Sequence, residues 1–323
     1  MAKVSDDCLK VLVAAVGQLI EACMTRFVYM ADTHFGANPM GYQMQPGYPE
    51  RLPELLRLLD AWIAEHGPVD FILHGGDMLD GMTPANLTGA REAFRLPVPV
   101  HLCLGNHDLT TLDALDAWLA GASEFFPGGR SDYSVYSGEC GVHVVTSHWQ
   151  ERPYHWVNAL HPHFLPGQLD RVEHEVAAHP ELVHILLTHN PVLDVPGEQR
   201  GETTPFHLPP PAFTETIQGM VQRHPEIRFV LGAHNHANMH VVAGGVHYVT
   251  ATSFSETPFE FKVIEVTPES IRMSTVALLP GTSFAARYDF DRTWVQGRLK
   301  DRAFVEERRP PEGGTANRGG AGL

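Results

Sequence analysis

The chain has 323 residues, of which 43% are hydrophobic and 19% are charged, and these proportions are typical of an ordinary globular protein. Its formal net charge of -15 argues against general binding to nucleic acid or to an anionic membrane, because both repel an acidic chain. Its four cysteines are scattered without a CxxC pair, which argues against a thiolate zinc site and a disulfide framework.

The first apolar stretch, residues 11–23, resembles the core of a weak signal peptide. Asp6 and Asp7 precede it, however, where a signal peptide carries positive charge. The stretch is also too short to span a bilayer. We therefore interpret residues 1–24 as an N-terminal extension and expect a cytoplasmic protein.

Short apolar runs, each ending in a cluster of polar residues, recur along the chain. They cover residues 26–30, 69–73, 98–104, 142–145, 182–187 and 227–231. Their length and their β-branched and aromatic content are typical of buried strands. Amphipathic helical patterns lie between them at residues 50–67, 165–182 and 211–226. Alternation of strand and helix predicts an α/β layered fold.

The pattern changes after Gly245. Three strand-like segments, residues 246–254, 259–267 and 270–278, predict a closing β-rich section that packs on the first part. The chain then ends, over residues 308–323, in Pro- and Gly-rich sequence with almost no apolar residues. We therefore expect residues 291–323 to be a largely disordered tail.

The polar clusters at the strand ends contain the same few residue types. They include Asp32, His34, Asp77, Asn106, His189, His234 and His236. Carboxylate, imidazole and amide oxygen together suit Mn, Fe, Co or Zn, and seven ligands suit two metals that share one carboxylate. Each cluster alone also has a simpler interpretation, as a solvated strand end, a surface turn or a helix cap.

Five motifs occur in a fixed order: Asp-x-His (32–34), Gly-Asp-x-x-Asp (76–80), Gly-Asn-His-Asp (105–108), a lone His189 after a strand, and His-x-His (234–236). This series resembles the calcineurin-like metallophosphoesterase superfamily. It is similar to the branch that contains class III cyclic-nucleotide phosphodiesterases and glycerophosphodiesterases. The resemblance covers roughly residues 25 to 265.

The resemblance implies a four-layer α/β/β/α sandwich over residues 25–290 and two divalent or trivalent transition metals (Mn, Fe, Zn or Co). It implies that one metal is held by Asp32, His34 and His236. It implies that the other is held by Asn106, His189 and His234, with Asp77 as the bridge. His107 would be the catalytic residue that faces the leaving group or a phosphoryl oxygen. Asp80 and Asp108 would fix loops or orient ligands.

One position departs from the family. The family usually has Gly immediately before its His-x-His, whereas this chain has Ala233 there and Gly232 one residue earlier. If the family Gly requires a positive φ, Ala would cost about 1 kcal/mol. The departure concerns the loop geometry and not the identity of the ligands.

The expected function is hydrolysis of a small phosphodiester, with a metal-bridging hydroxide as the nucleophile. The motif loops 32–50, 77–86 and 105–125 contain no Lys or Arg, and only Arg152 and Arg200 occur in the other predicted rim segments, 147–156 and 195–211. A phosphomonoester dianion usually draws on such cations. The sparse positive charge therefore favours a diester.

Alternatives remain open. A phosphomonoesterase acting on a nucleotide or another small phosphate ester is the first, and a binding protein that kept the fold without catalysis is the second. A DNA nuclease is disfavoured by the net acidity. We expect a small phosphate-ester substrate and neither nucleic acid nor membrane as a partner, and the sequence leaves a homo-oligomer open. Five other histidines are better explained by packing or solvation, although two of them, His148 and His155, could line the pocket. The five are His74, His148, His155, His161 and His163.

Overall fold

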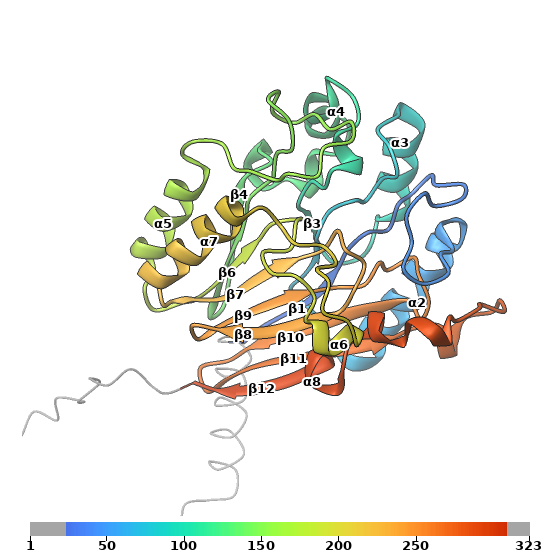
Figure 1. The fold of residues 1–323 in the computed structure, drawn as a ribbon. Helices are drawn as coiled ribbons and strands as arrows, with labels where there is room; N and C mark the ends of the chain where they lie inside the picture. The colour runs from blue at the N-terminus through green and yellow to red at the C-terminus, as the bar shows by residue number, and fades with distance from the viewer. Residues whose placement is uncertain (1–23, 309–323) are drawn as a thin grey trace, which may run out of the picture.

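The computed structural model describes residues 24–308 of the chain (Figure 1). Its helices and strands are β1 (Thr25–Met30), α2 (Leu52–His66), β2 (Phe71–His74), α3 (Pro84–Ala93), β3 (Val100–Leu102), α4 (Ala114–Gly121), β4 (Tyr133–Ser137), β5 (Cys140–Val144), α5 (Gln168–Ala178), β6 (Val183–Leu187), α6 (Gly197–Arg200), α7 (Pro211–Arg223), β7 (Ile227–Gly232), β8 (Met239–Ala243), β9 (Val246–Thr250), β10 (Glu260–Val266), β11 (Ser270–Ala277), the 3-10 helix η6 (Phe290–Gln296), α8 (Leu299–Arg302) and β12 (Ala303–Glu307).

Two six-stranded sheets contain all of these strands. The strand order is β12-β11-β10-β1-β2-β3 in the first sheet and β4-β5-β6-β7-β9-β8 in the second. β1, β2 and β3 run parallel, and so do β5, β6, β7 and β9. The remaining neighbours are antiparallel. Because parallel strands end at the same edge, each sheet gathers the loops after its strands at one place.

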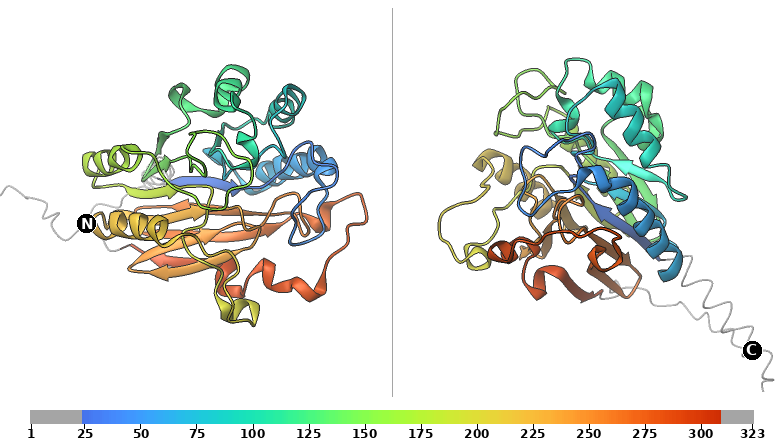
Figure 2. Two further views of the ribbon diagram at one scale, coloured as in Figure 1. Left: turned by 45° about the horizontal axis from the view of Figure 1, so that its top comes forward. Right: turned by 90° about the vertical axis from the view of Figure 1, so that its right-hand side faces the viewer.

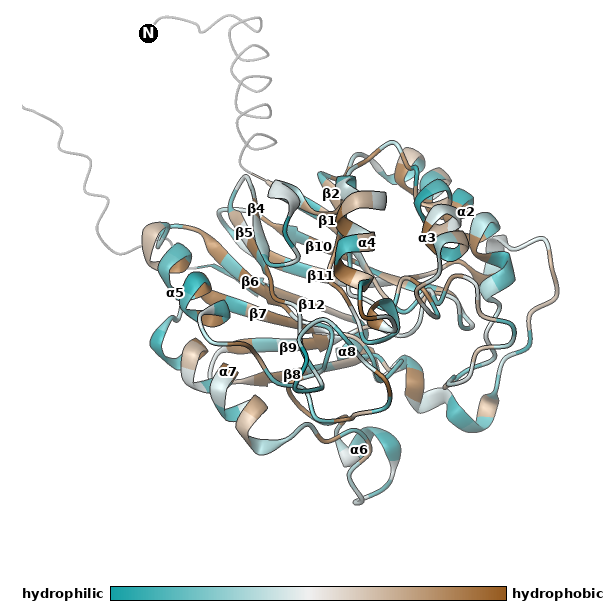
Figure 3. Ribbon diagram, turned by 90° about the horizontal axis from the view of Figure 1, so that it is seen from above, coloured by the Kyte–Doolittle hydropathy of each residue, from teal (hydrophilic) through white to brown (hydrophobic). Residues whose placement is uncertain are grey.

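The central strands β6 and β7 of the second sheet are apolar on both faces. In β6, Ile185 and Leu187 belong to the larger core, whereas Leu186 joins the smaller core formed with α5 and α7. α5 contributes Val172 to that smaller core, and α7 contributes Ile217. The two helices lie side by side (Figures 1 and 2). In Figure 3, most of α5 is coloured hydrophilic, whereas β6 and β7 contain hydrophobic stretches. Strands covered on both faces explain the continuous apolar runs in the sequence.

Helix α2 covers the first sheet. Its buried positions recur at spacings of three and four residues, which is the pattern of one helical face, and they are Leu52, Leu55, Leu56, Leu59 and Ile63. These side chains join the core that contains β1 and β2. The helix ends before Gly67, whose φ of 97° suits glycine. With helices on both sides of the paired sheets, the predicted α/β/β/α fold is confirmed.

The prediction of a largely disordered tail from residue 291 is wrong for residues 291–308. These residues complete η6 and form α8 and β12, and β12 pairs antiparallel with β11 from Glu307↔Ser270 to Ala303↔Ser274. The side chains of β12 alternate between exposed and half-buried, and Phe304 is the one apolar side chain of this strand that packs against the core, so the strand leaves a weak signal in the sequence. The remainder of that tail, and residues 1–23, lie outside the described residues.

The sequence patterns did not predict every helix and strand. α3, α4, β4 and β8 were not predicted, although α3 has a readable start. The side chain of Thr83 accepts a hydrogen bond from the Asn86 amide at 3.1 Å, and Pro84 occupies the first turn. None of the helices between residues 24 and 308 combines the length and the apolar character needed to cross a membrane.

Candidate metal centre

The seven predicted ligands meet at the carboxyl ends of the parallel strands. Asp32 and His34 follow β1, Asp77 follows β2 and Asn106 follows β3. His189 follows β6 in the second sheet, and the His-x-His pair follows β7. All except His234, which is half-buried, are buried. The two sheets thus contribute to one site from opposite sides.

The side chains form two clusters whose ligand atoms lie within 4.8 Å of one another. The first contains Asp32, His34 and His236, and the second contains Asp77, His189 and His234. The Asn106 side-chain oxygen lies 3.2 Å from His189 Nε2 and so joins the second cluster. Asp77 also lies within 4.8 Å of His34, which places its carboxylate between the two clusters.

The first cluster has the donor geometry of a metal site. His34 Nε2 lies 3.2 Å from His236 Nε2. The outer nitrogen of each ring faces a carboxylate, since His236 Nδ1 is 2.5 Å from Glu256 Oε1 and His34 Nδ1 is 3.3 Å from Asp80 Oδ1. When the outer nitrogens carry the hydrogens, the lone pairs of the two inner nitrogens face each other. A cation bound by both would relieve that repulsion.

The second cluster is built in the same way. His189 Nδ1 lies 2.9 Å from the Gly75 carbonyl oxygen, which can only accept, so this nitrogen carries a hydrogen. His189 Nε2 then faces three further acceptor groups, His234 Nδ1 at 3.2 Å, the Asn106 oxygen at 3.2 Å and Asp77 Oδ2 at 3.3 Å. A cation bound among them would satisfy these acceptors, and both ligand sets fit a divalent metal of the Mn, Fe, Co or Zn type.

Burial and neighbouring charges shift the pKa values of the carboxylates and histidines at the centre. Burial, helped by Asp77 and Glu256, raises the pKa of Asp32 well above its usual range. Burial opposes ionisation of Asp77 as well, but the nearby histidines, His189 first, hold its pKa well below its usual range. The carboxylates of Asp77 and Asp32 in turn outweigh burial and raise the pKa of His189 to about 9. Metal binding at His189 Nε2 would therefore compete with a proton.

The backbone at the centre is strained. Five of the seven residues have positive φ although none is glycine, namely Asp32 (54°), His34 (45°), Asp77 (52°), His234 (66°) and His236 (53°). Non-glycine residues in this region cost of order 1–3 kcal/mol each and cluster at functional sites. Ala233 is not among them, and its amide donates to the His189 carbonyl oxygen at 2.7 Å. The alanine that replaces the family glycine therefore introduces no backbone strain.

Asp108 fixes the loops that carry the ligands. It is fully buried, and its two carboxylate oxygens accept from the amides of Leu79 and Gly105, both at 2.9 Å. These amides belong to the loops after β2 and β3, which carry Asp77 and Asn106. The Asp108 carboxylate thus ties the two loops together.

His107 lies on the open side of the centre. Its amide donates to Asp77 Oδ1 at 2.8 Å, and its ring Nδ1 lies 2.9 Å from the Asp80 carbonyl oxygen. The ring is edge-on to His34, with centroids 4.8 Å apart, and its side chain is 25% exposed, far more than the 3% of His34. Burial opposes protonation, but the charge of Asp77 and the hydrogen bond to Asp80 raise the pKa of His107. The ring nitrogens of His107 also lie within 4.8 Å of the ligand atoms of His34 and Asp77, so distance does not separate it from the predicted ligands. The greater exposure of its side chain does.

Sequence reasoning missed Glu256. This glutamate is 1% exposed and contacts His236 through Oε1, while Oε2 accepts from the amides of Gln45 at 2.7 Å and Met44 at 3.0 Å. Burial raises its pKa to about 8, against the opposing effect of those amides. The only available signal was an acidic residue among the small polar residues between two strands of the closing section.

The three rim segments all reach the centre. Tyr42 packs edge-on against His236 with centroids 5.0 Å apart, and Trp156 lies 5.1 Å from His107. From the third segment, His207, which the sequence did not single out, packs edge-on against His234 at 4.7 Å. The walls of the site are therefore aromatic.

The other histidines take structural positions. His74 is fully buried, with Nδ1 accepting from the Gly76 amide at 3.2 Å and Nε2 3.1 Å from the Thr33 hydroxyl. His148 is also buried and accepts from the Tyr154 amide. His155 and His163 are half-buried and His161 is exposed. Arg152 is exposed and donates to the Leu112 carbonyl oxygen at 3.4 Å.

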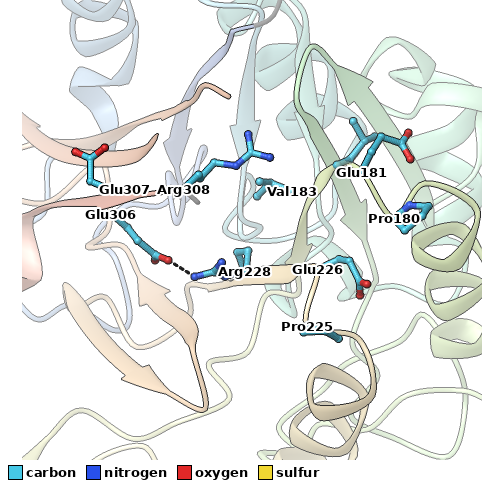
Figure 4. A pocket seen from close by; sticks show the side chains of 10 residues that line it. Pro180, Glu181, Val183, Pro225, Glu226, Arg228, Glu306, Glu307 and Arg308 are labelled. Carbon is cyan, nitrogen blue, oxygen red and sulfur yellow. Dashed lines mark hydrogen bonds and ion pairs between the residues drawn. The ribbon is translucent and has the colours of Figure 1, made fainter. Parts of the chain in front are cut away.

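A separate cavity of about 600 Å³ lies at the opposite ends of the strands, where β6 and β7 begin (Figure 4). Four glutamates line it, and both of its arginines are paired, Arg228 with Glu306 and Arg308 with Glu139 at 2.9 Å. Its excess of carboxylates is unsuited to a phosphate ester. The chemistry gathered after the strands is thus remote from this cavity.

Comparison with known proteins agrees with this geometry. The family model for calcineurin-like phosphoesterases matches residues 25–238. No curated protein matches the chain. A dimetal phosphatase from Danio rerio is similar in structure, with a TM-score of 0.61 and 16% identity over 78% of this chain and 96% of its own.

Two further solved structures share the fold. The anchor in the inner membrane complex of Plasmodium has a TM-score of 0.56 and 11% identity, covering 82% of this chain and 88% of its own. A putative 5'-nucleotidase from Staphylococcus aureus has a TM-score of 0.54 and 13% identity, covering 86% of this chain and 58% of its own. At these identities the likeness concerns the fold alone.

Proposed function

The chain belongs to the calcineurin-like phosphoesterase family, and from that premise we propose that it hydrolyses a small phosphodiester with two transition-metal ions. The observation that carries the proposal is the position of Asp77. Its carboxylate lies within 4.8 Å of His34 in one cluster and of His189 and His234 in the other. A carboxylate has two oxygens and can serve two metals at once.

The proposed ligand sets follow the two clusters. Asp32, His34 and His236 would hold one metal, Asn106, His189 and His234 would hold the other, and both would share Asp77. When bound, the two ions supply Lewis acidity for the phosphoryl oxygens and a nucleophile derived from water. Glu256 and the Gly75 carbonyl oxygen orient His236 and His189 through their outer nitrogens, so that the inner nitrogens would face the metals.

His107 is the proposed proton donor to the leaving group. With Nδ1 held by the Asp80 carbonyl oxygen, Nε2 is the nitrogen that can deliver a proton. The charge of Asp77 and the hydrogen bond to Asp80 outweigh burial and raise the pKa of His107, which favours the protonated ring that a proton donor needs. Its exposure allows a substrate oxygen to approach it.

The walls of the site favour a diester. The groups that pack on the proposed ligands and on His107 are rings, including Tyr42, Trp156 and His207. A singly charged phosphodiester needs little positive charge beyond the metals, and its second organic group can pack on these rings. A dianionic monoester usually requires a bidentate arginine at the phosphoryl group itself.

The test compares two substrates with the same leaving group. The protein loaded with Mn²⁺ should show a higher kcat/KM for bis(p-nitrophenyl) phosphate than for p-nitrophenyl phosphate at one pH and metal concentration. The reverse order, kept with natural nucleotides, would establish the monoesterase instead.

The second candidate is a phosphomonoesterase. It is supported by Arg200 and Arg292, which line a cavity beside Tyr42, and by the phosphatase and the nucleotidase among the similar structures. In that case one of these guanidinium groups would have to reach the phosphoryl oxygens. Substituting each arginine by Gln should then lower kcat/KM for p-nitrophenyl phosphate more than for the diester.

A further inference from the structure

A cavity of about 480 Å³ adjoins the centre on the side of the His-x-His pair. Its lining includes Tyr42, Met44, Arg200, Phe206, Arg292 and Trp294. Tyr42 packs on His236, and Phe206 precedes His207, whose ring packs on His234. A molecule bound at the centre on this side would therefore extend into the cavity.

Hydrogen bonds connect the walls of the cavity to the centre. Glu256, the partner of His236, accepts from the amides of Met44 and Gln45. The Gln45 side chain donates to the carbonyl oxygens of Asp289 at 3.0 Å and of Arg292 at 3.1 Å, and it accepts from the Asp289 amide at 2.9 Å. The loop that carries Tyr42 thus holds the start of η6 in place.

Helix α6, which carries Arg200, is also bonded to the rest of the cavity wall. The Gln199 side chain in α6 donates to the Trp294 carbonyl oxygen at 2.9 Å and to the Asn238 carbonyl oxygen at 2.7 Å. Asn238 lies two residues after His236. Because each wall is bonded to another wall or to the centre, the cavity is preformed.

The side chains of the cavity are of two kinds. Phe206 and Trp294 lie edge to face, with centroids 5.2 Å apart at 83°, and with Tyr42 they supply ring surfaces. The guanidinium group of Arg200 lies over Phe206 at 5.6 Å. Arg292, half exposed, supplies a second guanidinium group 3.6 Å from the Asp289 carboxylate.

Arg200 is the unusual residue of this set. Its side chain is only 5% exposed, its Nη1 lies 3.3 Å from Glu202, and its Nη2 donates to the Thr204 carbonyl oxygen. Among the described residues its Nε finds no hydrogen-bond partner. The Arg200 guanidinium group, which lines the cavity, therefore keeps donor capacity that the described residues do not use.

We propose that this cavity binds the organic group of the substrate, and that this group is a planar ring carrying its own negative charge. The rings provide stacking surfaces, and the two arginines outnumber Glu202, the one carboxylate that lines the cavity, so they leave positive charge for an anionic group. Either an aryl carboxylate or a nucleotide with a second phosphate has this chemistry. The inference rests on the proposed phosphoesterase function, because the phosphate end of the same molecule binds at the metals.

Binding of phosphonates, which are not hydrolysed, tests the cavity without turnover. Phenylphosphonate and 4-carboxyphenylphosphonate share the ring and the metal-binding group and differ only in the added carboxylate. Calorimetry on the Mn²⁺-loaded protein should give about 10- to 100-fold tighter binding of the carboxylated compound, the range for a hydrogen bond to a charged group. The 5'-phosphonate analogue of adenosine monophosphate, with and without a second phosphonate group at the 3' position, forms the second pair and distinguishes the nucleotide source.

The arginines must account for the preference. Arg200→Gln and Arg292→Gln should each reduce it by about tenfold or more, whereas Arg223→Gln, an exposed arginine of α7 paired with Glu173, should retain it. Trp294→Leu should weaken the binding of both members of each pair, because it removes a ring surface of the cavity. Unfolding transitions of the variants check that each is folded.

Two results would overturn the proposal. One is equal affinity for both members of both pairs in the unmodified protein, and the other is a preference that survives in both arginine variants. Either result leaves the phosphoesterase function standing, because hydrolysis of bis(p-nitrophenyl) phosphate is measured separately. A protein that hydrolyses no ester yet keeps the arginine-dependent preference would sink the proposed function and leave the cavity as a binding site.

Discussion

Glu256→Gln is the most informative single change at the centre, because it preserves size and alters only hydrogen bonding. The Glu256 carboxylate receives three hydrogen bonds, one from His236 Nδ1 at 2.5 Å and two from the amides of Met44 and Gln45. A glutamine cannot accept all three. If its oxygen keeps the two amides, its NH₂ group faces His236 and turns Nδ1 into the acceptor.

The consequence reaches the metal through the imidazole. With Nδ1 as acceptor, the hydrogen of His236 moves to Nε2, the nitrogen that faces His34 Nε2 at 3.2 Å. A protonated nitrogen cannot bind a metal, so the ring must be held in its less favourable tautomer to act as a ligand. Loss of such an outer partner typically lowers metal affinity about 10- to 100-fold, or about 1.4–2.7 kcal/mol.

The assay is competition between the protein and a chelator for Mn²⁺ or Zn²⁺. Glu260→Gln is the matched control, because Glu260 is also 1% exposed but bonds to Arg302 and to the side chain of Asn238 at 2.6 Å. It should lose stability while its metal affinity stays close to that of the unmodified protein. Equal metal affinity in both variants would refute the role assigned to Glu256.

Three further outcomes follow from the structure. Metal-saturated protein should contain two metals per chain, and Asp77→Ala should lower occupancy of both; one metal in the saturated parent protein would contradict the shared ligand. His107→Ala should lower turnover by roughly 10²–10⁴-fold and leave metal content nearly unchanged, so metal lost from this variant would make His107 a ligand. Burial lowers the pKa of Lys262 to about 7, so from about pH 7 to pH 10 the unfolded chain binds more protons and stability rises with pH. Lys262→Met should remove about 1.4 kcal/mol per pH unit from that slope, and an unchanged slope in urea unfolding would show that Lys262 stays charged when folded.

The residues at the centre were predictable because each follows a strand. Asp77 and His189 are 112 positions apart, yet each stands just after a short apolar run, and parallel strands end at one edge of a sheet. Strand periodicity and ligand chemistry therefore predicted which residues meet. Neither needed the detailed packing of the sheets.

Glu256 and Arg292 were not predictable by the same reasoning. Glu256 approaches His236 from the connection between β9 and β10, and Arg292 approaches Tyr42 from η6, in the segment expected to be disordered. Their positions depend on how β10, β11 and β12 extend the first sheet, and this extension is made by antiparallel pairing whose partners are remote in sequence. The sparse positive charge noted in the motif loops was therefore a property of those loops and not of the whole site.

The backbone strain lies at the metal ligands and not at the residue where the sequence suggested it. The sequence raised the question of strain at Ala233, whereas the structure locates it at the ligands, with Asp32 at φ 54° and His34 at 45°. The Asp32 amide donates to the Gly76 carbonyl oxygen at 2.9 Å, the His34 amide donates to the Asp77 carbonyl oxygen at 3.0 Å, and the Ser253 hydroxyl donates to the Asp32 carbonyl oxygen at 2.6 Å. These bonds come from the loops that follow β2 and β9, so the strained turn after β1 is imposed by the assembled fold and not by local preference. Because the fold fixes this backbone, metal binding would need little rearrangement, and bound metal would stabilise the folded chain by mass action.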